Sequence, residues 1–171
     1  MSILKINEYG DSILREKAEF IDKVKSKDLD LIDDMIETML EADGIGLAAN
    51  QINVPKSIAV INLTFFDETM PPQAFLNIEL LESNGKNLLE EGCLSIPGVR
   101  EEVKRPEHIK ISYRDVFGER KTLECRGLLA RVFLHELDHL NGVLFVDRLS
   151  SVKRKLLDKK LKNIVKSKHI S

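Results

Sequence analysis

The stretch His135-Glu136-Leu137-Asp138-His139 contains the side chains of this chain that are best suited to chemistry. Residues four apart on a helix lie one above the other, so His135 and His139 can hold one metal ion between them. Glu136 lies beside them and can accept a proton from a water molecule. The pattern predicts metal-assisted hydrolysis, provided that the rest of the chain supplies a third ligand.

The third ligand is not where zinc peptidases with this motif usually have it. Phe145 stands where one large group has a histidine, and no glutamate follows Glu136. Asp147 remains a candidate but lies in the apolar run VLFVDRL, and His169 lies close to the end of the chain. Upstream, the thiolate of Cys93 suits a borderline or soft divalent metal. The alternative interpretation of this cysteine is a small buried hydrophobic residue.

The segment GIGLAANQ, residues 44–51, places two glycines and two alanines before a single amide side chain, Gln51. Small residues let another backbone approach closely, as a bound substrate would require. The segment lacks the spacing and the lysine of a phosphate-binding loop. A tight helix-to-strand connection would also explain the glycines, but it does not account for Gln51.

Helices and strands are predicted around these motifs. The apolar residues between Leu29 and Leu40 recur with a period of 3.6, which predicts an amphipathic helix ending before Gly44. The segment 128–140 is apolar around most of its circumference, so we expect a buried central helix that carries both histidines. Polar groups on such a helix need partners, which favours a metal. Strands are predicted at 57–63, 74–81, 108–114 and 119–125, with a hairpin turn at 115–118.

A last helix is predicted from about Ser151. Its apolar residues are Val152, Leu156, Leu157, Leu161, Ile164 and Val165, and its other face is rich in lysine and arginine. No linker divides the chain, so we expect one catalytic domain over residues 1–171 with an α+β fold.

Composition excludes several classes of protein. The 171 residues are 43% hydrophobic and 32% charged, which is typical of a soluble globular protein. A formal charge of -2 and the absence of tryptophan argue against a surface built to bind nucleic acid or stack its bases, and no specific DNA binding is expected. The sequence shows neither a signal-peptide pattern nor a membrane-length apolar run, so we expect a cytoplasmic protein with reduced Cys93 and Cys125.

Together, GIGLAANQ, EGCLS and HELDH resemble the three signature motifs of the peptide deformylases, and the resemblance covers nearly the whole chain. It implies an enzyme that removes the formyl group from the N-terminal formyl-methionine of newly synthesised polypeptides and releases formate. It also implies an α+β fold in which antiparallel or mixed β-sheets surround a central metal-binding helix, with a C-terminal helix. The implied cofactor is one divalent metal ion, Fe²⁺ in the cell, for which Zn²⁺, Ni²⁺ or Co²⁺ can substitute.

The resemblance assigns roles to particular residues. Metal ligation falls to Cys93, His135 and His139, and general base catalysis to Glu136. The family's oxyanion donors correspond to the side chain of Gln51 and the backbone N–H of Leu94, and such a donor contributes about 100- to 1000-fold in rate.

Substrate contacts are expected on both sides of the metal. Ile45 and Gly46 correspond to residues that pair with the substrate backbone like an added strand. The apolar pocket for the methionine side chain has Leu89, Leu128 and Val132 as candidates.

Four positions remain open. Asp138 could accept a hydrogen bond from a ligand imidazole or form a surface salt bridge. Arg100 and Arg105 could position substrate or pair with a core carboxylate. Leu134 departs from the family, which usually has glutamine immediately before the first histidine.

Two other functions are compatible with these motifs. A different metallohydrolase could use the same three ligands on another small amide or ester. A non-enzymatic metal-binding or ribosome-associated protein would need neither Glu136 nor Gln51. The expected partners are formyl-methionyl nascent peptides and, through the basic last helix, the ribosome, with no membrane. That lysine face could equally be an ordinary solvated surface.

Overall fold

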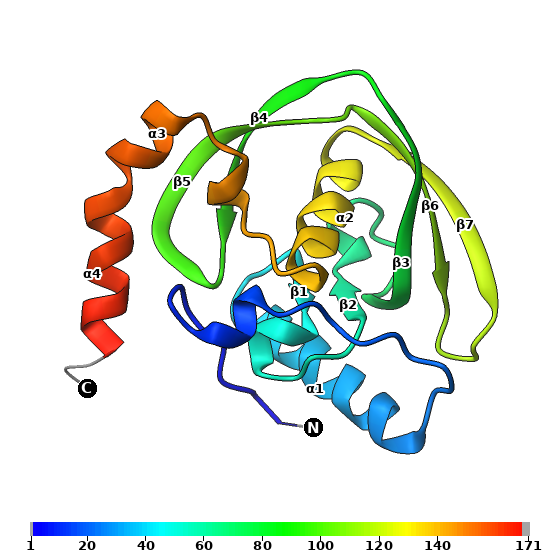
Figure 1. The fold of residues 1–171 in the computed structure, drawn as a ribbon. Helices are drawn as coiled ribbons and strands as arrows, with labels where there is room; N and C mark the ends of the chain where they lie inside the picture. The colour runs from blue at the N-terminus through cyan, green and yellow to red at the C-terminus, as the bar shows by residue number, and fades with distance from the viewer. Residues whose placement is uncertain (1, 169–171) are drawn as a thin grey trace.

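Helix α2 (Gly127–Leu140) lies at the centre of the molecule and is surrounded by β-strands in the computed structural model, which describes residues 2–168 (Figure 1). The strands are β1 (Gly46–Ala48), β2 (Ile58–Ile61), β3 (Gln73–Asn84), β4 (Asn87–Cys93), β5 (Ile96–Arg105), β6 (His108–Arg114) and β7 (Arg120–Arg126). The other helices are α1 (Ser26–Glu41), α3 (Ser151–Leu156) and α4 (Asp158–Lys168). Short 3-10 segments are η1 (Ser12–Arg15), η2 (Ala49–Ile52), η3 (Leu63–Phe65) and η4 (Phe145–Arg148).

The strands form two separate antiparallel sheets. One has five strands in the order β1-β2-β3-β6-β7, and the other is the two-stranded β4–β5 hairpin. In Figure 1, β3, β6 and β7 lie on one side of α2 and β5 lies on the other, with α4 outside β5. The α+β class expected from the sequence is therefore confirmed.

One apolar cluster packs α2 against the five-stranded sheet, and we call it the helix core. Its centre is aromatic, because the ring of Phe133 meets that of Phe75 edge to face at a centroid distance of 4.8 Å. The buried members of the helix core are Ala48, Ala59, Ile61, Leu63, Phe75, Ile78, Ile109, Ile111, Tyr113, Cys125, Ala130, Val132, Phe133, Leu134 and Leu140.

A second cluster, the hairpin core, packs β5 against the chain ends and η4. Its buried members are Ile13, Leu14, Ile96, Val99, Val103, Leu144, Phe145, Val146, Leu157, Leu161 and Ile164. The two clusters are separate. The helix core has no buried member from β4 or β5, and the hairpin core has none from α2. A third cluster lies beneath α1.

The predicted elements can be compared with the observed ones. Helices α1 and α2 and strands β2, β3, β6 and β7 are confirmed within a few residues of their predicted bounds. Strands β1, β4 and β5 were not predicted. The prediction of one continuous last helix is wrong, because the segment breaks at Leu157 into α3 and α4. As a result Val152 and Leu156, predicted on the buried face, are 69% and 77% exposed.

Two further predictions concern the chain as a whole. Cys93 and Cys125 are both free thiols. Within residues 2–168, the helices are all too short or too polar to cross a membrane. His169, considered as a ligand, lies outside the described residues.

Candidate active site

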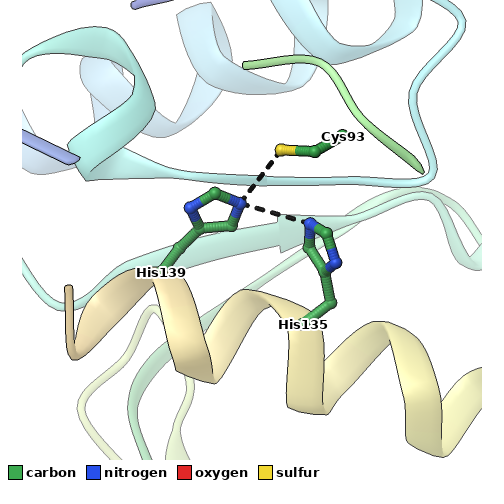
Figure 2. Close-up of side chains that lie close together, drawn as sticks. All are labelled: Cys93, His135 and His139. Carbon is green, nitrogen blue, oxygen red and sulfur yellow. Dashed lines mark hydrogen bonds between the residues drawn. The ribbon is translucent and has the colours of Figure 1, made fainter. Parts of the chain in front are cut away.

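Three side chains that could hold a metal ion converge beside α2. Nε2 of His139 lies 3.2 Å from Nε2 of His135 and 3.2 Å from Sγ of Cys93 (Figure 2). The two histidines project from one face of the helix, while Cys93 comes from the end of β4. All three donor atoms lie within 4.8 Å of one another. Two imidazoles and one thiolate fit a borderline divalent metal, and three protein ligands leave one position open for water or substrate.

Glu136 is buried beside these donors. It is 3% exposed, and its Oε2 atom has no hydrogen-bond partner among the described residues. Burial raises the pKa of Glu136 to about 7, although the nearby His135 opposes this shift. A Cβ at Gly46 would lie 2.6 Å from Oε1 of Glu136, so only glycine leaves room for this carboxyl group. A carboxyl group that titrates near neutral pH can both accept and return a proton.

Gln51 presents its amide NH₂ group to the same centre. Its Oε1 atom accepts a hydrogen bond of 3.0 Å from the backbone N–H of Ala48. Nε2 donates to Oγ of Ser95 at 3.0 Å and to Sγ of Cys93 at 3.6 Å. These contacts fix which end of the amide faces the metal ligands.

Glu91 orients one of the histidines, and its role was missed by sequence reasoning. Nδ1 of His135 lies 2.9 Å from Oε1 of Glu91. An ionised carboxylate only accepts, so Nδ1 carries the proton and Nε2 keeps a lone pair for the metal. Burial disfavours ionised Glu91, but hydrogen bonds from His135 and Arg105 outweigh it and lower the pKa of Glu91 to about 2. Glu91 is the first residue of the motif EGCLS, and that position was the sequence feature that could have pointed to this role.

Asp138 does not contact a ligand imidazole. Its carboxylate accepts from Arg105 at 2.9 Å and from Arg148 at 2.7 Å, so the salt-bridge interpretation is the one that holds. The contacts of Arg100 and Arg105 also differ from each other. Arg105 pairs with core carboxylates, whereas Arg100 forms an exposed pair with Glu90 at 2.6 Å.

The two imidazoles favour different protonation states. Burial disfavours charge on His135, but the adjacent Cys93 and Glu91 outweigh it and raise the pKa of His135 well above its ordinary value. Burial, together with the neighbouring His135, lowers the pKa of His139 well below its ordinary value. His139 is therefore neutral at physiological pH, and a metal would compete with a proton only at His135.

A cavity of about 470 Å³ opens beside these groups. Its lining comes from the segment between Asp43 and Gly46, from β4 and β5, and from α2. Its lining includes the predicted contacts Ile45, Gly46, Gln51, Leu94, Arg100, Leu128 and Val132, together with Cys93, His135 and Glu136.

Leu89, predicted in the apolar pocket for the methionine side chain, is not among the residues that line this cavity. Leu89 is 38% exposed and is absent from the lining, whereas Arg131, one turn before His135, belongs to it. Arg131 donates to the carbonyl oxygen of Leu89, so the arginine reaches the strand from the helix side. A charged residue within the apolar first half of α2 was the signal for Arg131.

Two further positions considered from the sequence, Leu134 and Asp147, make structural contacts. Leu134, where the family usually has glutamine, is 7% exposed and belongs to the helix core. Asp147, a candidate ligand, pairs with Arg15 and accepts from the backbone N–H of Leu144. His139 differs from His135 in that its Nδ1 atom has no partner among residues 2–168.

A pair of imidazoles, a thiol and a buried carboxylic acid gather beside a cavity of about 470 Å³, and these are the groups that a hydrolase able to hold a metal would use, so the fold and site indicate a hydrolase. The particular family follows from comparison with known proteins. Residues 3–155 match the model of the polypeptide deformylase family, and the chain belongs to that family.

Similar sequences come from several bacteria. A peptide deformylase of Mesorhizobium japonicum is 45% identical, over 92% of this chain and 90% of its own length. One from Helicobacter pylori is 45% identical, over 98% of this chain and 97% of its own length. The chain is therefore an enzyme that removes the formyl group from the N-terminal formyl-methionine of new polypeptides.

Solved structures agree with the fold. A crystal structure of a peptide deformylase from Legionella pneumophila superimposes with a TM-score of 0.89 at 37% identity, covering 99% of each chain. A peptide deformylase from Synechococcus elongatus, in complex with actinonin, has a TM-score of 0.86 at 43% identity, covering 92% of this chain and 87% of that one.

Proposed function

We propose that Cys93, His135 and His139 hold one divalent metal ion and that Glu136 is the general base of deformylation. The observation that carries this proposal is the buried Glu136 carboxyl group, which lines the same cavity as Cys93 and His135 and has one oxygen without a hydrogen-bond partner among residues 2–168. A purely structural metal site has no need of such a group. A metal bound here would act as a Lewis acid and make hydroxide available near neutral pH.

The chain's own residues would carry out the remaining work. Glu136 takes the proton of the attacking water at a carboxylate oxygen and returns it to the leaving amine. The Gln51 amide and the backbone N–H of Leu94 donate to the oxygen of the tetrahedral intermediate. Ile45 and Gly46 pair with the peptide backbone, because β1 is the edge strand of its sheet.

Selection of the substrate would follow from size. The cavity beside Leu128 and Val132 takes the methionine side chain. A formyl carbon carries only a hydrogen, so a narrow site at the metal excludes acetylated and internal amides. We propose one catalytic domain over residues 1–171.

The metal in the cell is proposed to be Fe²⁺, with Zn²⁺, Ni²⁺ and Co²⁺ as substitutes. Support comes from the donor set, since two imidazoles and a thiolate suit each of these borderline ions. Iron content and turnover of protein purified without oxygen, compared with the zinc form, test this proposal. Higher turnover with zinc would contradict it.

The functional test is turnover of a formyl-methionyl peptide without oxygen by the wild type, Glu136→Ala and Glu136→Gln. Both variants should keep the metal and lose about 100- to 10,000-fold in kcat, the range for a general base. Glu82→Gln, an exposed change on β3, is the matched control and should have wild-type turnover. Full turnover by either Glu136 variant would overturn the assignment, and equal hydrolysis of acetyl-methionyl peptide would favour a different metallohydrolase.

We also propose that the protein acts in the bacterial cytoplasm and that α3 and α4 contact the ribosome. Fewer basic residues are available for such a contact than the sequence contains. Lys153, Arg154 and Lys168 already bond to residues outside these two helices. Lys155, Lys159, Lys160, Lys162 and Lys166 are exposed.

Sedimentation with ribosomes tests this contact. Lys159→Glu with Lys160→Glu should weaken a salt-dependent association. Lys86→Glu, between β3 and β4, should not. Equal co-sedimentation of both variants would contradict the proposal.

A further inference from the structure

The metal ligands belong to two parts of the molecule with separate apolar cores. His135 and His139 stand on α2, which packs in the helix core, while Cys93 packs against the hairpin core. The β4–β5 hairpin shares no strand pairing with the five-stranded sheet. Something other than a shared apolar core or a common sheet must therefore hold the thiol opposite the imidazoles.

Arg131 makes this connection from the helix side. It is 3% exposed, and its guanidinium donates to the backbone oxygen of Asn87 at 2.8 Å and to that of Val103 at 2.8 Å. Asn87 begins β4 and Val103 lies in β5, so one side chain bonds both strands of the hairpin. The same guanidinium reaches Oε2 of Glu91 at 2.5 Å.

Arg105 makes the reciprocal connection from the hairpin. It lies at the end of β5 and joins Glu91, in its own sheet, to Asp138 on α2. Its partners are both carboxylates. Arg131 differs because it also donates to three backbone carbonyl oxygens, those of Asn87, Leu89 and Val103, and so holds the strands themselves.

The geometry points to Arg131 as a positioning residue that fixes the β4–β5 hairpin against α2 and so places the Cys93 thiol for metal binding. Cys93 lies two residues beyond Glu91 on the same strand, so a hairpin held at Glu91 and Asn87 leaves the thiol little freedom. This inference rests on the proposed function, because it takes Cys93 as a ligand. Arg131 acts on the metal only through the strands.

Lysine cannot replace Arg131. Its single ammonium group lacks the planar fork that reaches two strands and a carboxylate at once. Residues that hold ligands in place typically account for 10- to 100-fold in metal affinity. If Arg131 merely stabilised the fold, its replacement would lower the melting temperature without changing the metal affinity of the folded protein.

The test measures Co²⁺ affinity of the full-length protein, without oxygen, by competition with a chelator and by the thiolate-to-cobalt absorption band. Arg131→Met should bind Co²⁺ about 10- to 100-fold more weakly, and Arg131→Lys should be intermediate. In the metal-free Arg131→Met protein, amide exchange should be faster in β4 and β5 and unchanged in α2. Arg148→Met is the matched control, because Arg148 joins the same ionic network at Asp138 without an observed bond to the hairpin. Its affinity should equal that of the wild type.

Two results would overturn the inference, and they are distinguishable. Normal cobalt binding by wild type and Arg131→Met alike would reject the role of Arg131 and leave the ligand set intact. A wild type that binds cobalt without a thiolate band would reject Cys93 as a ligand, and the inference with it. If Arg131→Met does not fold, Arg131→Lys carries the same comparison, and wild-type affinity in that variant would overturn the inference.

Discussion

Helix α2 and the β4–β5 hairpin both bring ligands to the candidate metal site, yet they are held in place by different forces. Helix α2 lies within the helix core, where burial of apolar surface is non-directional and does not depend on pH. The hairpin meets α2 through Glu91, Arg105 and Arg131, whose ionic hydrogen bonds are directional and depend on charge. Packing thus secures the histidines, while a buried ionic network secures the thiol.

The largest effect is expected from a cavity in the helix core. Phe133 is 1% exposed and packs against Phe75, so Phe133→Ala should lower the free energy of unfolding by about 3–5 kcal/mol. Phe117→Ala, at an 86% exposed position, should change it by less than about 0.5 kcal/mol. Urea unfolding of the metal-free proteins measures both. A loss below about 1 kcal/mol for Phe133→Ala would mean that packing does not hold α2.

The next effect should appear in the hairpin and should depend on pH. The pKa of Glu91 falls from 4.5 to about 2 on folding, so its ionised form contributes about 3 kcal/mol of stability above pH 4.5. This contribution is lost as the pH falls from 4.5 towards 2. The stability difference between wild type and Glu91→Gln should therefore shrink by about 3 kcal/mol over that interval. Urea unfolding of metal-free protein at pH 7, 5 and 3 checks it, because about 2 kcal/mol of this difference should already be lost at pH 3. A constant difference would contradict the charge-based account.

The smallest effect is expected at the neighbouring carboxylate. Glu90 pairs with Arg100 on the same hairpin, with side chains that are 57% and 63% exposed. Exposed pairs contribute about 0–1 kcal/mol, so Glu90→Gln should change the free energy of unfolding by less than about 1 kcal/mol. The same urea series provides the measurement. A loss as large as that of Glu91→Gln would show that burial does not distinguish the two glutamates.

The two regions also differ in how far they could be predicted. A period of 3.6 and the spacing of His135 and His139 predict α2 and two ligands, because local pattern and burial agree there. In β4, Leu88 and Leu89 are half exposed while Glu91 is buried, so the pattern of polar and apolar residues is inverted. No local rule reveals that Glu91 finds partners in Arg105 and Arg131, which lie 14 and 40 residues away in sequence. The chemistry of its thiolate and the resemblance to a family pointed to Cys93, but neither revealed the residues that hold it in place.

The C-terminal segment shows a different limit. Leu157, Leu161 and Ile164 share one face and are buried as predicted. The break at Leu157 turns α3 away from that face and leaves Val152 and Leu156 exposed. No glycine or proline lies in this stretch to signal the break, whereas Leu157, Leu161 and Ile164 pack in the hairpin core with residues of β5.

X-ray absorption of the zinc-loaded protein at the metal edge tests most directly whether helix and hairpin meet at one ion. The account predicts one sulfur at about 2.3 Å and two imidazole nitrogens at about 2.0–2.1 Å around the zinc. Cys93→Ala should lose the sulfur and keep the nitrogens. A wild-type zinc shell without sulfur would contradict the account.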